Sequence, residues 1–365
     1  MGLLRLLLAL SVVASHGNAI FTLEMVGRQI SVQTFFILSG FYITMILNEK
    51  YVGKNKSYLL FISNRLMRLY PVYWCILILE LVSCFIIYFK SNGLEFHIIG
   101  FYLENKPSIL SIIFLVFSNI FIFLKDLVPF LAFDNSSGNL FFTINNAIYL
   151  TKVDSFQAIP QGWSLGVELM FYLIAPFLVT KKPKIILVII CTSLVLRCHL
   201  YNVLHLQFDP WLNRFFPTEM ALFLSGYFSY QLYKYLKKIK YNQKINLFFY
   251  IIILTFTFFY QWIPAYKCSL LPFSFKEIIY FFTIIIGIPF LFNSLKSNYL
   301  DMLLGNLSYP IYISHILIIN ICNVIPFELF KNNIVKTLVL LVNAYLLHKW
   351  VEIPVEKFRQ SRLKI

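Results

Sequence analysis

The feature that most constrains this chain is a series of apolar segments, each long enough to cross a lipid bilayer. A transmembrane helix needs about 20 mostly apolar residues, because each residue advances about 1.5 Å and the hydrocarbon layer is about 30 Å thick. Ten segments meet this requirement: 3–20, 30–48, 70–89, 163–180, 183–200, 217–235, 246–264, 277–294, 303–323 and 334–353. The sequence therefore predicts an all-α, polytopic transmembrane helical bundle of about ten spans, forming a single membrane domain over residues 1–365.

The low charge content excludes a soluble domain of this size. Only 13% of the 365 residues are charged, 59% are hydrophobic, and the formal net charge is +15. In a polytopic membrane protein this positive surplus is explained by basic cytoplasmic loops beside anionic lipid, so we expect membrane lipids but no nucleic acid as partners. The six cysteines form no CxxC pair and lie mostly in apolar runs, which predicts neither a disulfide framework nor a metal site.

The distribution of basic residues predicts that both termini are cytoplasmic. Lysines and arginines gather at 50–68, 181–184, 234–244 and 357–364, and basic loops stay on the cytoplasmic side. This orientation requires the stretch 108–151 to cross the membrane an even number of times.

The stretch 108–151 allows two readings. It holds an apolar run at 109–124, a turn-like segment at 134–138 and a weaker second run that ends at Leu150. A re-entrant or outer-surface element gives ten spans, whereas two crossings give twelve. Four polar residues within 139–146 make the second run a poor span and favour ten.

The first apolar segment, Met1 to Ile20, contains two ionisable side chains, Arg5 and His16. Eleven residues at about 100° each return to nearly the same face, and place the two side chains about 16 Å apart along the axis. Arg5 is then near one membrane surface, and His16 lies well inside the membrane or toward the other surface. A cleaved secretory signal has a similar composition, but it needs no histidine on the face of its arginine. We interpret the segment as the first span.

Two further patterns lie near the second and third segments. Ser39 and Gly40, within FFILSGF, are small enough to let another helix or a thin ligand approach the backbone. Arg65 and Arg68 are three residues apart and share a helical face at the predicted cytoplasmic surface. Such a pair anchors a helix to lipid headgroups, or it binds phosphate groups.

Polar side chains also enter the fourth and ninth segments. Glu168 follows Trp163 by about one turn of helix and needs a partner in hydrocarbon, for which His16 is at a suitable depth. Ser308, Tyr312 and His315 follow an i, i+4, i+7 pattern, which places hydroxyl, phenol and imidazole on one stripe.

Other ionisable residues are interpreted as structural. Glu352, at the inner end of the last segment, is expected to pair with a basic residue such as Arg65, Arg68 or Arg5. Arg197, His199 and His348 lie near helix ends, from which such side chains extend to the interface.

Taken in order, these patterns resemble the acyltransferase 3 family of bacterial integral membrane acyltransferases, which modify surface sugars such as O-antigen, capsule and peptidoglycan. The six matching motifs are Arg-x10-His at Arg5 and His16, Phe-Phe-x-Leu-Ser-Gly-Phe at Phe35 to Phe41, Arg-x-x-Arg at Arg65 and Arg68 before Pro71, Trp-Ser-Leu-x-x-Glu at Trp163 to Glu168, Ser-Tyr-x-x-Tyr-x-x-His at Ser308 to His315, and Glu-x-Pro at Glu352 to Pro354.

The resemblance implies an O-acyltransferase of the bacterial cytoplasmic (inner) membrane. Its donor would be a cytoplasmic acyl-CoA, most often acetyl-CoA, and its acceptor a hydroxyl of a lipid-linked or polymeric glycan such as O-antigen, capsule or exopolysaccharide. The chain resembles the members without a fused hydrolase-like domain. The implied roles are catalysis by His16 and Glu168, donor binding by Arg5, Arg65, Arg68, Ser39 and Gly40, and pocket lining by Trp163, Ser308, Tyr312 and His315, with no metal.

In this picture His16 deprotonates the acceptor hydroxyl, a general-base role worth about 10²–10⁴-fold, while Glu168 holds the imidazole tautomer. A covalent acyl-histidine is an alternative route. The rival function classes are a proton-coupled secondary transporter, with Glu168, His16 and His315 as a relay, and a polysaccharide flippase or scaffold.

Overall fold

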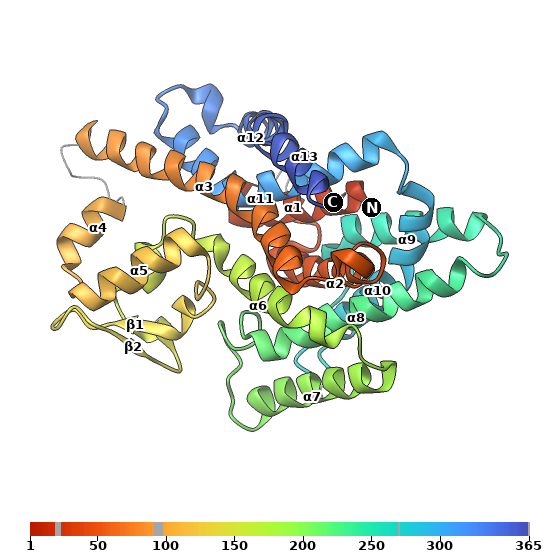
Figure 1. Cartoon of the computed structure of the whole chain (residues 1–365). Coiled ribbons are helices and arrows are strands. Elements are labelled where there is room, and N and C mark those ends of the chain that lie inside the picture. The colour runs from red at the N-terminus through yellow and green to blue at the C-terminus, as the bar shows by residue number, and fades with distance from the viewer. Residues whose placement is uncertain (19–22, 91–97, 269–270, 364–365) are drawn as a thin grey trace.

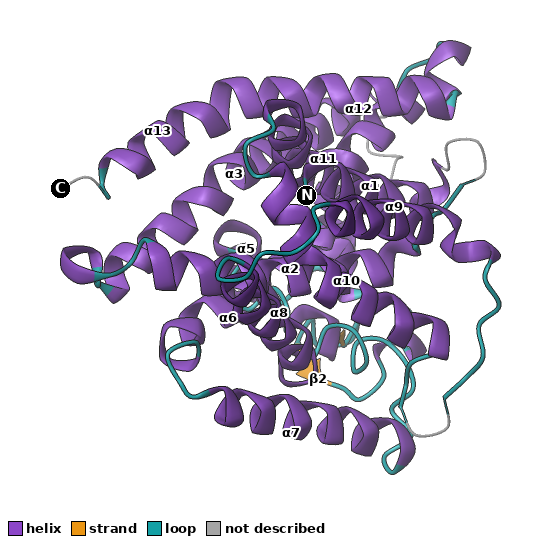
Figure 2. Cartoon of the chain, turned by 90° about the vertical axis from the view of Figure 1, so that its right-hand side faces the viewer, coloured by secondary structure: helices purple, strands orange, loops and turns teal. Residues whose placement is uncertain are grey.

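The computed structural model describes residues 1–18, 23–90, 98–268 and 271–363. It is a bundle of helices with a small lobe on one side that contains α4, α5 and a hairpin (Figure 1). The α-helices are α1 (Gly2–Val13), α2 (Gly27–Glu49), α3 (Tyr58–Lys90), α4 (Ile98–Asn105), α5 (Ile109–Phe121), α6 (Trp163–Leu178), α7 (Pro183–Asn202), α8 (Phe216–Leu236), α9 (Lys244–Phe259), α10 (Phe275–Leu295), α11 (Tyr299–Val324), α12 (Asn333–Leu347) and α13 (Ile353–Ser361). In the view of Figure 2, α12 and α13 run along one side of the bundle and α7 along the opposite side.

Seven helical segments are long and apolar enough to cross a membrane, among the residues that the structure describes. They are Gly27–Glu49, Tyr58–Ile87, Pro183–Asn202, Lys244–Trp262, Phe275–Leu295, Tyr299–Val324 and Asn333–Ser361. Each of the ten predicted segments coincides with a helix, but three fall short as spans. The helices α1 and α6 have only 12 and 16 residues, and α8 carries many hydroxyl side chains as well as Glu219 and Lys234. The chain is a multi-pass membrane protein.

The first helix is an integral part of the bundle. It packs against α11, α2 and α9. A Cβ added at Gly2 would lie only 1.5 Å from the backbone oxygen of Asp301, so the two backbones touch. The Asp301 carboxylate pairs with the amine of Met1 at 2.5 Å and accepts from the amides of Gly2 and Leu3, which satisfies the free donors at the start of α1.

The helices α2 and α8 cross at backbone contact. A Cβ added at Gly40 would lie 1.8 Å from the Phe223 oxygen, and one added at Gly226 would lie 2.3 Å from the Ile37 oxygen. Only glycine permits this approach, as at small-residue contacts between membrane helices. Gly40 is therefore a helix-packing residue of α2.

The stretch 108–151 lies within the lobe. After α5 it forms a hairpin in which β1 (Leu131–Phe133) pairs antiparallel with β2 (Leu140–Phe142), followed by single helical turns. All of its residues are described, and none after Phe121 belongs to an α-helix. The twelve-span alternative is therefore wrong, because the second run cannot satisfy its backbone groups in lipid.

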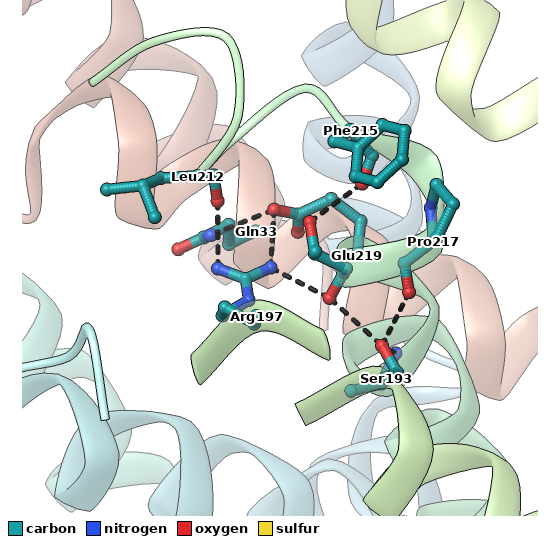
Figure 3. Close-up of polar contacts among 9 residues, drawn as sticks. Gln33, Ser193, Arg197, Leu212, Phe215, Pro217 and Glu219 are labelled. Carbon is teal, nitrogen blue, oxygen red and sulfur yellow. Dashed lines mark hydrogen bonds and ion pairs between the residues drawn. The ribbon is translucent and has the colours of Figure 1, made fainter. Parts of the chain in front are cut away.

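Arg197 does not extend to the interface as predicted. It is 1% exposed, and it pairs with Glu219 at 2.7 Å while donating to the backbone oxygens of Leu212 and Thr218 (Figure 3). Gln33 also donates to Glu219, at 3.2 Å. This network joins α2, α7 and α8. The prediction failed because the carboxylate partner lies on another helix.

Candidate active site

A cavity of about 500 Å³ lies among α1, α2, α3, α6, α11 and α13. The sequence-predicted residues on its wall are Arg5, Ser39, Arg65, Arg68, Glu168, Ser308 and Tyr312. Met1 and Leu363 line it as well, so both ends of the described chain lie at the same side of the bundle. The structure thus brings motifs from five separate parts of the sequence to one hollow.

The cavity carries an excess of positive charge. In the part of the chain that the structure describes, no carboxylate lies within ion-pair distance of Arg5, Arg65 or Arg68. Of the acidic residues on the wall, Asp301 is paired with the amine of Met1. A buried guanidinium without a carboxylate needs another anion, and its planar set of N–H donors suits phosphate oxygens. The cavity is therefore suited to an anionic ligand.

Glu168 makes its hydrogen bonds on the cavity wall. It accepts from the hydroxyl of Ser39 at 2.5 Å and from the phenol of Tyr172. These bonds connect α6 to α2. The sequence placed Glu168 beside His16, but the imidazole that lies against the ring of His16 is that of His315.

The two histidines meet where α1 ends. The α-helix gives way to a π-helical turn, Ala14–Asn18, and the His16 and His315 ring centroids lie 5.0 Å apart. His16 is exposed, whereas His315 is fully buried. The rotation of 100° per residue that the sequence prediction assumed applies only as far as Val13, because a π-helical turn contains more residues than an α-helical turn. Such turns are frequent at functional sites.

His315 is held in one orientation. Its Nδ1 lies 2.6 Å from the backbone oxygen of Tyr312, and its buried Nε2 has no hydrogen-bond partner among the described residues. Because a carbonyl oxygen only accepts, Nδ1 carries the hydrogen. The lone pair of a neutral ring is then on Nε2.

Tyr312 connects the cavity with the histidine pair. It lines the cavity together with Ser164, and the two hydroxyls lie 2.7 Å apart. The Tyr312 ring centroid is 6.0 Å from that of His315. The stripe predicted for Ser308, Tyr312 and His315 therefore runs from the cavity to the histidines.

Four predicted site residues do not line the cavity: His16 and His315, which lie beyond Tyr312, and Gly40 and Trp163. Gly40 packs against α8, as described above, and Trp163 lies under the guanidinium of Arg214, 4.8 Å from the ring centroid. Ser39 and Ser164, next to Gly40 and Trp163 in sequence, line the cavity instead.

Glu352 does not pair with Arg5, Arg65 or Arg68. Its carboxylate lies 2.7 Å from Nδ1 of His348, four residues earlier on a second π-helical turn, His348–Glu352. The prediction was wrong because His348, on the same helical turn as Glu352, is nearer to this carboxylate than the arginines of the other helices. Both residues line a second cavity of about 400 Å³, which also includes Arg68.

Sequence reasoning missed Lys125, which supports the turn before α6. Its ammonium donates to Gln157 at 2.7 Å, Asn119 at 3.2 Å and Tyr73 at 3.3 Å, and burial lowers its pKa to about 7. A Cβ added at Gly162 would lie 3.0 Å from this side chain. An isolated lysine in a loop gave no sequence signal of this role.

Comparisons with known proteins identify the family of this chain. The model of an acyltransferase domain family, acyltransferase 3, matches residues 1–347. An uncharacterized protein of Aquifex aeolicus (strain VF5) is 28% identical over 223 residues, which cover 59% of this chain and 95% of that protein. No solved structure matches, and no group of three or more potential metal ligands occurs among the described residues. The chain belongs to the acyltransferase 3 family and is a membrane acyltransferase.

Proposed function

We propose that this protein transfers an acyl group, most often acetyl, from cytoplasmic acyl-CoA to a hydroxyl of a cell-surface glycan at the bacterial inner membrane. One observation carries the proposal. A single cavity joins arginines that have no carboxylate at ion-pair distance among the described residues to Tyr312, whose ring centroid lies 6.0 Å from that of His315. A polyanionic thioester fits this arrangement, with its phosphates at the arginines and its acyl group toward the histidines.

In the proposed reaction, His16 accepts the proton of the glycan hydroxyl as the hydroxyl oxygen attacks the thioester carbonyl carbon. The carbon–sulfur bond breaks, and CoA leaves as a thiolate that takes the proton from the imidazolium. General-base catalysis of this kind is worth about 10²–10⁴-fold. The exposure of His16 favours an acceptor that approaches from outside the cavity.

The contacts of His315 support a positioning role for this residue. With its hydrogen on Nδ1, its Nε2 lone pair is free to accept a hydrogen bond from His16 or from the acceptor. This is the role that the sequence assigned to Glu168. Glu168 instead supports the donor cavity through Ser39 and Tyr172.

The decisive test is transfer of labelled acetyl by the protein in nanodiscs, with mass spectrometry of surface glycan from cells with and without the gene. We expect His16→Ala to lower transfer by at least about 10²-fold while CoA binding is retained. His199→Ala, on the exposed surface of α7, is the matched histidine control. Transfer by His16→Ala at the wild-type rate would remove His16 from the mechanism.

The acyl-histidine route predicts a labelled protein when donor is supplied without acceptor, whereas direct transfer predicts none. A transporter predicts gradient-driven uptake that does not require CoA. A gain of acetyl mass on the glycan that depends on the gene and on His16 would exclude that class.

A further inference from the structure

We infer that the second cavity, between α3, α11 and α13, binds the 3′-phosphate of CoA, with Arg359 and Lys357 as its cationic contacts. This inference rests on the proposed function, because it assumes a CoA donor. It adds a recognition site from the C-terminal helix that lies outside the six sequence motifs.

The two cavities share a wall. Arg68, Glu356 and Arg359 line both, whereas Tyr312 and Ser164 line only the first. A thioester whose reactive end lies beside the histidines therefore has its other end near the shared wall. Lys357 lines the second cavity alone.

Arg359 is a buried cation with unused hydrogen-bonding capacity. The residue is 7% exposed, its Nη1 pairs with Glu356 at 2.9 Å, and its Nε has no partner in the described chain. The positive charges of Arg65 and Arg68 act on it. The second cavity is lined by three cations, Arg68, Lys357 and Arg359, and by two carboxylates, of which Glu352 is held by His348 and Glu356 by Arg359. An excess of buried cations is costly unless a further anion binds between them.

Arg362 provides an internal comparison. It lies one turn after Arg359, and therefore on nearly the same face of the C-terminal segment. Its guanidinium donates to Asn64 at 2.9 Å and to Ser63 at 3.0 Å, which fastens this segment to α3. Arg362 therefore anchors the C-terminal segment to α3, and the buried charge of Arg359 is not needed for this anchoring.

The phosphate groups of CoA match the two groups of cations in the two cavities. CoA carries a pyrophosphate between its pantetheine and adenosine parts, and a phosphate monoester at the 3′ position of its ribose. Arg65 and Arg68 are placed for the pyrophosphate, and Arg359 with Lys357 for the monoester. A phosphate dianion forms strong charge-assisted hydrogen bonds with such groups. An anionic lipid headgroup offers similar chemistry, so the test must distinguish the two.

The test compares the binding of CoA and of 3′-dephospho-CoA to the full chain in nanodiscs of phosphatidylcholine, by titration calorimetry. We expect the wild-type protein to bind CoA at least about tenfold more tightly, as the loss of a charged hydrogen bond predicts. Arg359→Gln and Lys357→Gln should each bring this ratio toward one and leave the affinity for dephospho-CoA unchanged. Lys349→Gln, an exposed lysine that lines neither cavity, should leave the ratio unchanged.

Three results would overturn the inference. The first is equal affinity of the wild-type protein for the two nucleotides. The second is that the preference for CoA over dephospho-CoA disappears in Lys50→Gln or Lys296→Gln but persists in Lys357→Gln. Lys50 and Lys296 line only the first cavity. The third is an unchanged nucleotide ratio in the two variants, together with reduced retention of phosphatidylglycerol when they are purified from membranes that contain this lipid, which would assign the site to lipid. Absence of binding by both nucleotides would instead contradict the proposed function itself.

Discussion

Arg197 and the pair Arg65 and Arg68 differ in how their charge is compensated. Arg197 pairs with Glu219, donates to two backbone oxygens and lies 4.8 Å from the ring centroid of Phe273. Arg65 and Arg68 line a cavity and have no carboxylate at ion-pair distance in the described residues. Depth in the membrane is therefore a weaker indicator of function than incomplete compensation of charge, because a paired ion needs no ligand.

The largest effect is expected at the compensated site. Glu219→Gln leaves Arg197 buried without a counter-charge, which costs about 3–5 kcal/mol of folding free energy. The apparent melting temperature in detergent should fall clearly. The double replacement Arg197→Met with Glu219→Leu should recover most of the loss, since paired apolar residues can replace a buried ion pair. A single variant that melts at the wild-type temperature would contradict a structural role for the pair.

The uncompensated site should respond differently. Arg68→Gln removes a charge that has no carboxylate at ion-pair distance, so the melting temperature without ligand should fall much less than in Glu219→Gln. Its Kd for CoA should increase about tenfold, because a charged hydrogen bond is lost. Thermal shift assays with and without CoA give both quantities. A large loss of stability without ligand, with unchanged CoA affinity, would make Arg68 a structural residue like Arg197.

Lys125 is an intermediate case, with a smaller effect that depends on pH. Its pKa is about 7 in the folded protein and ordinarily 10.5, so between these values the unfolded chain holds more protons. Stability should therefore rise with pH across this window, by at most roughly 2–4 °C in melting temperature per pH unit.

Melting curves from pH 7.5 to 9.5 test this expectation against Lys125→Met. The range lies above the pKa of the neighbouring Asp126, which burial raises to about 6. The variant should melt lower throughout, since the side-chain oxygen of Gln157 loses its donor and that of Asn119 loses one of two. It should also show a smaller slope with pH. Equal slopes in the two proteins would show that Lys125 stays charged when folded.

Much of the architecture could be predicted from local sequence. The apolar segments coincide with helices, and the six motifs identify the family. Relations within one regular helix also held, such as Arg65 with Arg68 on one cavity wall and Ser308 with Tyr312 on another. These relations follow from 3.6 residues per turn, a property that each segment carries by itself.

Relations between helices could not be predicted in this way. The partners of Glu168, the packing of Gly40 and the pairing of Arg197 depend on which faces meet, and Glu352 found a partner on its own turn. The π-helical turn at the end of α1 also leaves His16 exposed, against the regular helix assumed from sequence.

The sequence by itself determined that this chain forms membrane helices with ionisable residues at fixed places along them, because hydrophobicity and helical periodicity act locally. Only the tertiary structure decided which of those residues neutralise one another and which face a cavity. That outcome depends on contacts between distant segments, such as Arg359 of the last helix with the cavity that Arg5 of the first helix also lines. A buried charge acquires its role from the groups that the fold places around it.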